Sequence, residues 1–510
     1  MIVSRALVSV FAFSSLVFSA PAALADGDTL RIAHYDLPAQ LGMPYGTFGS
    51  NGALPLHAVY DAMVYVDNQG APRPGLALSW EARGIDTWVL KLRDGVTFHN
   101  GKSFDAAVVA ANIEALTKDD VIRTQQVTRQ LAGIVGARVV DRLTVEIKTA
   151  FPDPILPLRI AIMRPHEPAA WRDMGPEGYG THPIGTGAYK IEEWTKESVT
   201  GVAFSEGWRQ TKIPRLEILA LPETAARVQA LNSGQVDIAW SLRPDSIAPI
   251  EGAGNKIISS PSNNTLNLML LHAKEGSPVT DVRVRRALNY AFNKESFIKN
   301  VLLGRTVAAS QPSSPGMTGH FANIAPYPYD PDKAKQLLAE AGYPNGFNMA
   351  AEIVVSVGEF KDTMEAMAND FKKVGVNLEL RVVTIPDFVK RVIGIVPWQG
   401  DAFSMMYEGY PSSDMARVMN THSCLVMNPR RKAPAHTCFN EIMPAIKSMN
   451  TTFDMVERNR FARQIAAFYH DQATAVFSHV RVDIDGLSAK VQNYSLVNRV
   501  IPFHELTFAK

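Results

Sequence analysis

The stretch Pro74-Gly-Leu-Ala-Leu-Ser-Trp80 and the run Leu92-Arg-Asp-Gly-Val-Thr-Phe-His-Asn-Gly101 decide the fold of this chain. Between them, residues 87–92 (Thr-Trp-Val-Leu-Lys-Leu) place side chains on alternate faces, as a β-strand does. The dipeptide Asp94-Gly95 is a turn signal beside such a strand. The stretch therefore predicts two strands with a turn.

Helical and strand-like segments alternate outward from this stretch. Ser103 is predicted to cap a helix that ends near Leu116, and Gly234 follows a second helix as a C-cap glycine does. Further patterns predict helices at 223–233, 282–292, 332–341 and 359–374, and strands at 29–33, 143–148, 189–194, 199–204, 236–240 and 377–383. This alternation predicts an α/β protein built in layers.

The first 25 residues have the three parts of a secretory signal peptide. Arg5 gives a positive start, residues 6–18 form an apolar run, and Ala23-Leu-Ala25 is a cleavage motif of small residues. We therefore expect the mature chain to begin at Asp26 and to lie in the periplasm. The residue directly after the cleavage motif is Asp26 and not cysteine, so a lipid anchor is not expected.

The mature chain, residues 26–510, carries no net formal charge. The full sequence has 51 Lys and Arg against 50 Asp and Glu, and Arg5 is the only charged residue before Asp26. A neutral chain has no general field with which to hold nucleic acid or an anionic membrane. No later apolar stretch is long enough to span a bilayer. At this length, two or three domains are expected.

Cys424 and Cys438 are the only cysteines in the sequence. In an oxidising compartment an even count favours one disulfide, which here would close a short polar loop. The alternative is a metal site, because His422 and His436 each precede a cysteine by two residues. Both pairs are H-x-C, not the C-x-x-C of zinc sites, so we favour the disulfide.

Six stretches follow one another in a fixed order along the chain. They are Pro74–Gly101 with Phe104-Asp-Ala, Pro183–Lys190, Leu231–Ile238, Asp281–Ala291, Tyr329–Leu338 with Ala341–Pro344, and the pair Cys424 and Cys438 with Phe439-Asn440. Together they resemble the extracellular solute-binding proteins of family 5, which serve peptide and nickel ABC importers. Most of these residues set turns or fill cores, so they identify the scaffold and not the ligand.

The resemblance implies a two-lobed α/β fold of the periplasmic-binding-protein type, with a hinge and an extra domain inserted in the first lobe. The first lobe would comprise 26–54, 182–271 and 486–510, the inserted domain 55–181, and the second lobe 272–485. A ligand between the lobes stabilises the closed form, because only that form contacts it from both sides. The implied function is capture of a small solute by a monomer without cofactor, and delivery to an inner-membrane ABC permease.

The segment Phe403–Asp414 is expected to face the ligand from the second lobe. Peptide-binding relatives carry an aspartate shortly after an aromatic residue, and it pairs with the amino terminus of the peptide. With Tyr407 as that aromatic, Tyr410 stands at the aspartate position, and Glu408 and Asp414 are the nearest acids. An ammonium group in a closing cleft needs a carboxylate partner, for which Glu408 is the candidate. The tyrosine weakens the case for ordinary peptides.

Arg164 is the first candidate for a carboxylate contact. Ile162-Met-Arg-Pro165 resembles an Arg-Pro stretch of the nickel- and metallophore-binding members, where an arginine meets the carboxylates of a chelating ligand. A guanidinium group offers the matching two-pronged geometry. A surface arginine beside a turn proline is the alternative interpretation. Further candidates are Arg123 as a second cation, and Phe48, Trp240 and Tyr407 as either cleft walls or core aromatics.

The expected ligand is a short peptide or a peptide-like amino-acid derivative, with a metal chelate or an opine-like anion as the alternative. A secreted hydrolase is the competing class, because Ser296-Phe-Ile-Lys299 fits the S-x-x-K of penicillin-binding enzymes. The S-D-N and K-T-G companions of that motif do not occur, nor does an H-E-x-x-H, a G-x-S-x-G or a P-loop. We therefore expect a binding protein, not an enzyme, with no metal site of its own.

Overall fold

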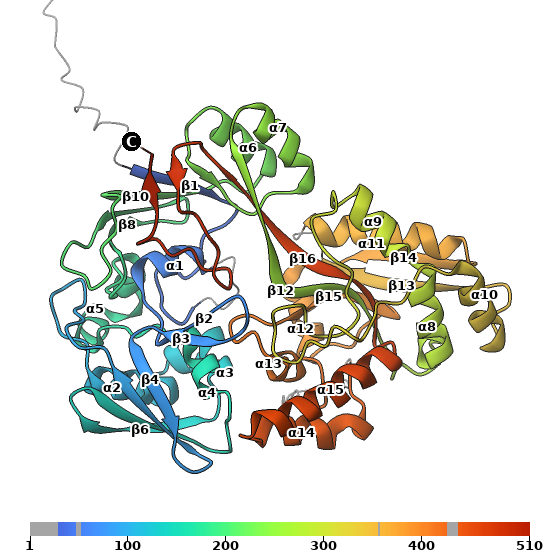
Figure 1. Cartoon of the computed structure of the whole chain (residues 1–510), viewed down its shortest axis with the longest axis horizontal. Coiled ribbons are helices and arrows are strands. Elements are labelled where there is room, and N and C mark those ends of the chain that lie inside the picture. The colour runs from blue at the N-terminus through green and yellow to red at the C-terminus, as the bar shows by residue number, and fades with distance from the viewer. Residues whose placement is uncertain (1–28, 47–52, 355–357, 426–436, 510) are drawn as a thin grey trace, which may run out of the picture.

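Ten strands form one continuous sheet that extends through both halves of the molecule (Figure 1). The computed structural model describes residues 29–46, 53–354, 358–425 and 437–509. The strands are ordered β14 (Val376–Val382), β13 (Phe347–Ile353), β15 (Ala402–Glu408), β12 (Lys256–Leu270), β16 (Ala475–Leu487), β11 (Ile238–Ala239), β1 (Thr29–His34), β10 (Arg215–Ala220), β9 (Ser198–Ala203) and β8 (Tyr189–Trp194).

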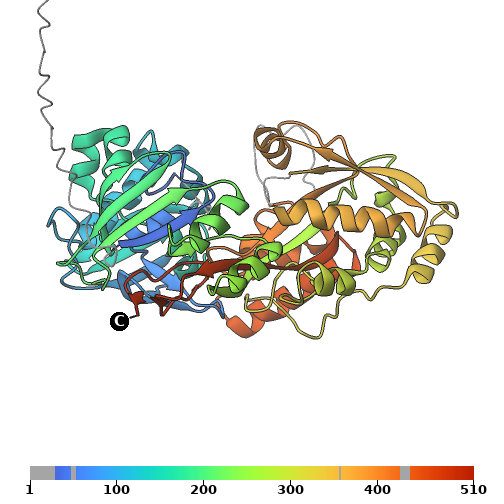
Figure 2. The same ribbon diagram turned by 90° about the horizontal axis from the view of Figure 1, so that it is seen from above.

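The long strands β12 and β16 join two lobes, which stand apart on either side of them in Figure 2. The first lobe holds β1 and β8 to β11, and the second lobe holds β13 to β15. At one end β16 pairs with β11, and at the other β12 pairs with β15. Between these ends β12 and β16 run antiparallel, with a register shift between Pro261 and Thr265. The chain thus crosses to the second lobe along β12 and returns along β16, and these two strands form the hinge.

A second, antiparallel sheet of four strands belongs to the first lobe, with α2 (Ala106–Lys118) packed against it. The helix buries Val109, Ile113 and Leu116 at helical spacing, in a core that also contains Ile32 of β1. The sheet is ordered β4 (Ala77–Ala82), β5 (Thr87–Leu92), β7 (Thr144–Thr149) and β6 (Ile134–Asp141). This lobe also contains α1 (Leu54–Val59), β2 (Val64–Val66), β3 (Pro72–Pro74), α3 (Gln126–Gln130), α4 (Leu156–Arg159), α5 (Pro168–Thr181), α6 (Thr224–Asn232), α7 (Ile247–Gly252), β17 (Val491–Gln492) and β18 (Thr507–Phe508).

Helices cover both faces of the sheet in the second lobe, because its strands alternate apolar side chains to both sides. On β12, Leu266, Leu268 and Leu270 belong to one core cluster, whereas Met269 belongs to another. The first cluster is formed with α8 (Val282–Ala291), α9 (Lys294–Asn300), α10 (Pro331–Glu340) and α11 (Gly358–Lys372), and the second with α13 (Met415–Met419), α14 (Met443–Thr451) and α15 (Met455–Asp471). The short helix α12 (Ile385–Val392) follows β14.

The predicted α/β class and two-lobed architecture are confirmed, and most predicted elements occur within a few residues of their expected bounds. One helix start was wrong. The helix α2 is capped by Asp105, not Ser103, since the Asp105 carboxylate accepts hydrogen bonds from the backbone nitrogens of Ala107 (2.9 Å) and Val108 (3.1 Å). The predicted inserted domain, residues 55–181, takes in the four-stranded sheet, and its boundaries stay a prediction.

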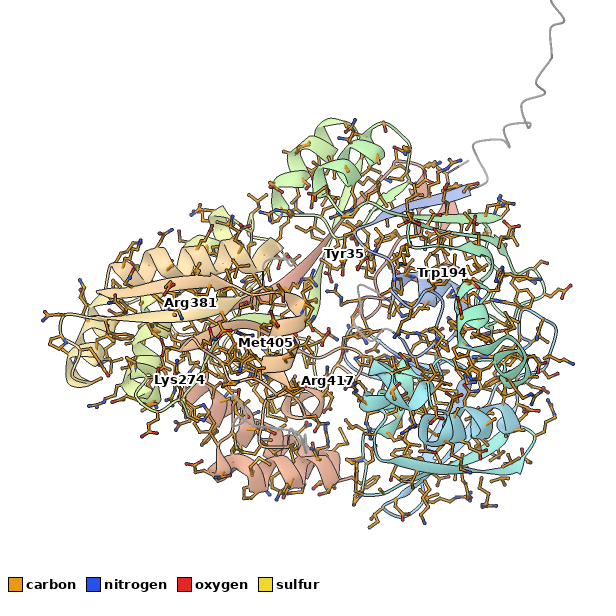
Figure 3. The ribbon with its side chains drawn as sticks, turned by 180° about the vertical axis from the view of Figure 1, so that it is seen from behind. Tyr35, Trp194, Lys274, Arg381, Met405 and Arg417 are labelled. Atoms are coloured by element: carbon orange, nitrogen blue, oxygen red, sulfur yellow. A yellow bond between two sulfur atoms is a disulfide. The ribbon has the colours of Figure 1, made fainter. Side chains whose placement is uncertain are left out.

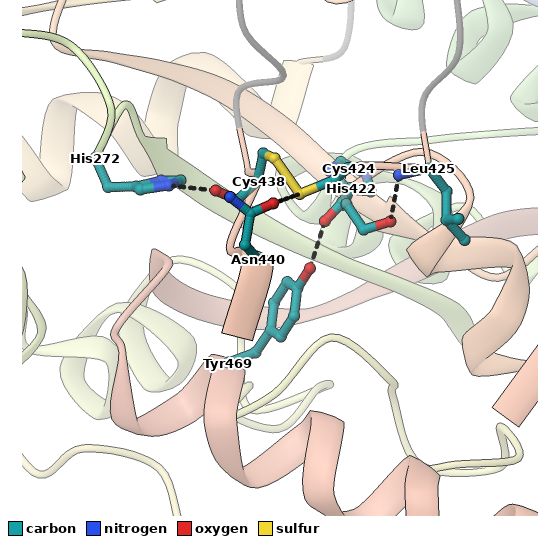
Figure 4. The surroundings of a disulfide bond; sticks show 8 residues. His272, His422, Cys424, Leu425, Cys438, Asn440 and Tyr469 are labelled. Carbon is teal, nitrogen blue, oxygen red and sulfur yellow. Dashed lines mark hydrogen bonds between the residues drawn. A yellow bond between two sulfur atoms is a disulfide. The ribbon is translucent and has the colours of Figure 1, made fainter. Parts of the chain in front are cut away.

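Cys424 and Cys438 form a disulfide, as predicted (Figure 4). Their sulfurs are therefore not metal ligands. Beside the bridge, the Tyr469 hydroxyl donates a hydrogen bond of 2.6 Å to the carbonyl oxygen of His422. Within the described residues, no group of three His, Cys, Asp or Glu side chains is placed to hold a metal ion. No helix in that part of the chain has the length and apolar character needed to cross a membrane.

Candidate functional site

A row of ionisable side chains lies on one face of the hinge strand β16. His479, Arg481, Asp483 and Asp485 occupy alternate positions, which share a face of a strand, yet none is more than 6% exposed. Burial of a charge is costly unless the charge is paired. An uninterrupted row of such residues inside a sheet is therefore not ordinary core, and it marks the hinge as a candidate site.

Residues from both lobes meet this row. Arg481 Nη1 lies 3.6 Å from Asp483 Oδ1, and Arg499 of the C-terminal segment contacts the other oxygen of Asp483. From α11 of the second lobe, Glu359 Oε2 lies 3.8 Å from His479 Nε2 and 3.9 Å from Arg481 Nε. Burial opposes ionisation of Glu359, but the contact with His479 and the charge of Arg481 outweigh it and lower the pKa of this carboxyl group.

A second ion pair extends the row into the wall of the second lobe. Arg417 Nη2 donates a hydrogen bond of 3.3 Å to Glu408 Oε2, and Arg417 Nη1 donates one of 2.7 Å to the Thr421 hydroxyl. Burial raises the pKa of Glu408, whereas the charges of Arg417, Arg499 and Arg481 act to lower it. Glu408 is thus electrostatically coupled to the hinge. We name Glu359, Glu408, Arg417, Arg481, Asp483 and Arg499 the charge cluster.

Asp485 ends the row in a different environment. Its carboxyl group accepts hydrogen bonds from the backbone nitrogen of Ser241 (2.9 Å) and the hydroxyl of Tyr494 (2.7 Å). Burial raises the pKa of Asp485 to about 7, against the lowering effect of these hydrogen bonds. This carboxyl group therefore changes its charge near neutral pH, next to the hinge.

Arg164 and Tyr410, both singled out from the sequence, line one cavity of about 220 Å³ that residues of both lobes enclose. Arg164 is 2% exposed and donates to the carbonyl oxygen of Pro44 (3.4 Å) and to His57 Nε2 (3.3 Å). Since Nε2 accepts, His57 carries its proton on Nδ1 and is neutral, and burial together with the Arg164 charge keeps its pKa well below the usual value. Burial raises the pKa of Tyr410, and the nearby Arg164 charge opposes that rise.

A second cavity, of about 330 Å³, reaches the charge cluster from the hinge. It is lined by residues 259–263 of β12 together with Asp483, Asn498 and Arg499. Serine and asparagine side chains contribute hydroxyl and amide groups to its lining. Asn498 borders both cavities, so the C-terminal segment contributes to the lining of each.

The other predicted contact residues lie away from these cavities. Tyr407 is fully buried in the second-lobe core, where its hydroxyl lies 3.0 Å from the Thr474 hydroxyl. Trp240 is 2% exposed and packs on His34, with ring centroids 4.7 Å apart. Arg123 is exposed and pairs with Asp120, at 3.0 Å. Phe48 lies outside the described residues.

The nearest acids to Tyr410 are both already partnered. Asp414 forms a two-pronged ion pair with Arg458, at 2.6 and 2.8 Å, and both side chains are almost completely buried. Glu408 pairs with Arg417 as described above. The tyrosine therefore stands at the predicted aspartate position without an unpaired carboxylate beside it in the chain segment 408–414.

Sequence reasoning missed the residues on β16 and those that meet them. Arg481, Asp483 and Asp485 alternate with Val482 and Ile484, and this alternation looks like an ordinary strand with one solvent-exposed face. Tyr35, which follows β1, was missed as well. Burial lowers the pKa of Arg499 against the charge of Asp483, whereas the pKa of Arg481 is raised because burial is outweighed by Asp483 and other neighbours. Tyr35 acts to raise both pKa values. Figure 3 shows Tyr35 near the junction of the lobes.

The family model for bacterial extracellular solute-binding proteins, family 5 Middle, matches residues 71–416. The chain is 32% identical over 267 residues to glutathione-binding protein GsiB of Pectobacterium atrosepticum, and it spans about half the length of that relative, 51% of each chain. It is 26% identical over 462 residues to the dipeptide-binding protein of Escherichia coli K12, covering 81% of this chain and 83% of the relative. The fold is similar to that of NikZ from Campylobacter jejuni in complex with Ni(L-His), with a TM-score of 0.79 at 20% identity over 94% of this chain and 99% of the other. The chain belongs to the bacterial extracellular solute-binding proteins of family 5.

Proposed function

We propose that this chain is the substrate-binding component of an ABC importer, working in the periplasm. It captures a small polar solute between its lobes, closes about the hinge and delivers the solute to an inner-membrane permease. The observation that carries this proposal is the charge cluster, whose members come from the second lobe, the hinge strand β16 and the C-terminal segment of the first lobe. A solute that contacts all three parts favours the closed arrangement, because the open one cannot offer them together.

The site is suited to binding and not to catalysis. Its acids are paired with arginines, and Ser296 of the S-x-x-K motif lies on the helix α9, outside the residues that line the two cavities. The names of the related proteins describe binding of glutathione and of dipeptides. We therefore propose that the solute leaves the protein chemically unchanged.

The ligand that we propose is a peptide-like amino-acid derivative with charges of both signs. Arg164 lines the first cavity, and Asp483 and Arg499 line the second, so a zwitterion between the lobes meets charges of both signs. Each buried charge of the ligand needs such a partner to offset the loss of its hydration. The names of the relatives, which bind glutathione or dipeptides, support this class.

A carboxylate-rich ligand, either a metal chelate or an opine-like anion, is the second candidate. Two observations favour it over an ordinary dipeptide: Tyr410 replaces the expected aspartate, and Arg164 lies in the same cavity. The solved relative from Campylobacter jejuni was obtained with Ni(L-His), which is a complex of this kind. In this alternative the metal is part of the cargo and not a cofactor of the chain.

Mass spectrometry of the solute that accompanies the purified protein, followed by thermal-shift measurements, tests both candidates. Dipeptides, glutathione, opines and Ni–histidine should be compared, because a ligand at 100 times its Kd stabilises the protein by about 2.7 kcal/mol. Peptide-like zwitterions should raise the Tm. A rise with Ni–histidine or opines alone would select the second candidate, and turnover of any of these compounds would contradict a binding role.

Substitution of Arg164 tests whether the ligand binds at the proposed site. The variant Arg164→Gln should lose at least tenfold in affinity, since a charge-assisted contact to a carboxylate is worth about 1.5–3 kcal/mol. Arg142→Gln is the matched control: this arginine belongs to the same lobe, but its side chain is 59% exposed and pairs with Asp94 at the surface. Equal affinities for the two variants would remove Arg164 from the proposed site.

A further inference from the structure

Phe453 of the second lobe packs against the first lobe. It lies between α14 and α15, yet its partly buried side chain contacts the core cluster of the first lobe, and its ring centroid is 6.1 Å from that of Trp88 on β5. The indole nitrogen of Trp88 donates a hydrogen bond of 3.0 Å to the carbonyl oxygen of Asp153, which fixes the Trp88 ring. Phe453 and Trp88 line neither of the two cavities described above. This contact therefore joins the lobes outside the candidate ligand site.

Two first-lobe side chains are buried against the second lobe in return. Leu158 of α4 and Ile155, just before that helix, are each 8% exposed. Both belong to the core cluster that is formed around α13, α14 and α15, and Figure 1 shows α4 and α13 facing each other at the junction of the lobes. We name Trp88, Ile155, Leu158 and Phe453 the apolar seam. Separation of the lobes would expose apolar surface of the seam to water, at a cost proportional to the exposed area.

The backbones of the two lobes also approach each other closely. Gly316 of the second lobe faces the turn between β2 and β3, and a Cβ atom at Gly316 would lie only 2.6 Å from the carbonyl oxygen of Asn68 in that turn. A Cβ atom at Gly70 of the same turn would lie 3.1 Å from the carbonyl oxygen of Ser413. Met317, which follows Gly316, belongs to the same core cluster as the first-lobe side chains of the seam. The turn is therefore seated on the second lobe, and a side chain at Gly316 would force the two backbones apart.

An electrostatic interaction crosses the junction beside the seam. Burial acts to lower the pKa of Arg458 on α15, but its ion pair with Asp414 and the charge of Asp153 raise that pKa above its usual value. Asp153 belongs to the first lobe, and its carbonyl oxygen is the one that accepts the hydrogen bond from Trp88. The buried guanidinium of the second lobe is thus stabilised in part by a first-lobe carboxylate.

We propose that the apolar seam holds the two lobes together before a solute binds, and that Phe453 is a positioning residue for ligand capture. The proposal rests on the proposed function, because it concerns the closure of the same site. A contact that forms only when the lobes are together favours the closed arrangement whether or not a solute is present. Since the seam lies outside both cavities, its contribution is the same for every solute and multiplies each affinity by one factor. The affinity is thus set in part by residues that do not contact the ligand.

Small-angle X-ray scattering tests the seam without any ligand. The full mature chain, freed of bound solute, is compared with Phe453→Ala and with Leu158→Ala, which shortens the seam from the first lobe. Both variants should have a larger radius of gyration, because the lobes lose apolar contact and separate more often. Met455→Ala is the matched control: Met455 lies two positions from Phe453, is 51% exposed and is not part of the seam, so the radius of gyration should not change. Circular dichroism checks that each variant is folded.

Ligand affinities distinguish a positioning residue from a ligand contact. The probes are glutathione, Ala-Leu and Ni–histidine, each titrated into the same proteins. Phe453→Ala should raise the Kd of every probe that binds by one common factor of up to about tenfold, which is the loss expected when one partly buried aromatic ring no longer packs. Met455→Ala should leave each Kd unchanged.

The failure of the seam is distinguishable from failure of the proposed function. An unchanged radius of gyration in either folded seam variant, or an equal increase in Met455→Ala, would overturn the seam. A loss of affinity in Phe453→Ala that differed between probes would make Phe453 a ligand contact and overturn its positioning role. If no probe binds to the unsubstituted protein, the ligand classes of the proposed function are wrong, and the scattering comparison still decides whether the seam holds the lobes together.

Discussion

Arg243 Nη2 lies 2.7 Å from Asp362 Oδ2, and this ion pair joins the two lobes. Arg243 follows β11 of the first lobe, whereas Asp362 lies on α11, the helix that also carries Glu359 of the charge cluster. The contact thus spans the junction directly beside the candidate site. Both side chains are about one third exposed, so the pair is worth at most about 1 kcal/mol.

The first prediction concerns this ion pair. If it forms only in the closed arrangement, Asp362→Ala should weaken ligand affinity by up to about fivefold, with a smaller effect at high salt. The exchanged pair Arg243→Asp with Asp362→Arg should recover part of the loss. Affinity can be measured with any ligand that raises the Tm. A loss that neither salt nor the exchange alters would indicate that the two residues act separately.

The second prediction is a pH dependence of stability due to Asp485. Its folded pKa of about 7 lies above the unfolded value of about 3.9, so the folded state binds more protons in this interval. The contribution of Asp485 to stability is complete below about pH 4 and is lost as the pH rises through 7.

Asp485→Asn tests that dependence, because asparagine resembles the protonated carboxyl group and does not titrate. As the pH rises from 4.5 to 8, the free energy of unfolding of the variant should increase by roughly 2–4 kcal/mol relative to that of the unsubstituted protein, as measured by urea unfolding. If the free energies of unfolding of the two proteins changed with pH in the same way over this range, Asp485 would not titrate there.

The third prediction assigns Asp414 to stability. Its pairing with Arg458 is buried on both sides, so Asp414→Asn should cost about 3–5 kcal/mol by leaving a buried guanidinium uncompensated. The control is Glu457→Gln on the same helix as Arg458: its partner is Arg460, both side chains are exposed, and the cost should stay below about 1 kcal/mol. If Asp414→Asn instead kept its stability and lost ligand binding, Asp414 would be a ligand contact.

The fourth prediction concerns the disulfide. Cys424 and Cys438 are separated by 14 positions, and closure of a loop of this length stabilises a fold by about 3 kcal/mol in the chain-entropy model. The double variant Cys424→Ser, Cys438→Ser should lose roughly that amount in urea unfolding. Addition of a reductant should lower the stability of the unsubstituted protein to the same level and leave that of the double variant unchanged. If the reductant also lowered the stability of the double variant, its effect on the unsubstituted protein could not be assigned to this disulfide.

Scaffold residues were predictable because their physical roles are local. Gly234 ends α6 at a φ of +75°, a conformation that glycine adopts freely, and β5 shows its strand pattern within six residues. The cap of α2 was misjudged by two positions because Ser103 and Asp105 are both good capping residues, and only the backbone geometry decides between them.

The site was only partly predictable. Arg164 and Tyr410 could be named from local motifs, and they do line one cavity although 246 positions separate them in the sequence. The row on β16 could not be recognised, because alternating charged and apolar residues usually indicate a strand with one face in water. Burial of that row depends on α11 and on the C-terminal segment, which are remote in sequence.

The sequence by itself determined the class of this protein: six ordered motifs specify turns, caps and core positions, and those act over a few residues. Tertiary structure decided where the charges meet. Glu359, Asp483 and Arg499 come together only when α11, the hinge strand β16 and the C-terminal segment pack around one point. The physical reason is that a buried charge is tolerated only beside its partner, and that partner is chosen by the packing of distant segments and not by neighbours along the chain.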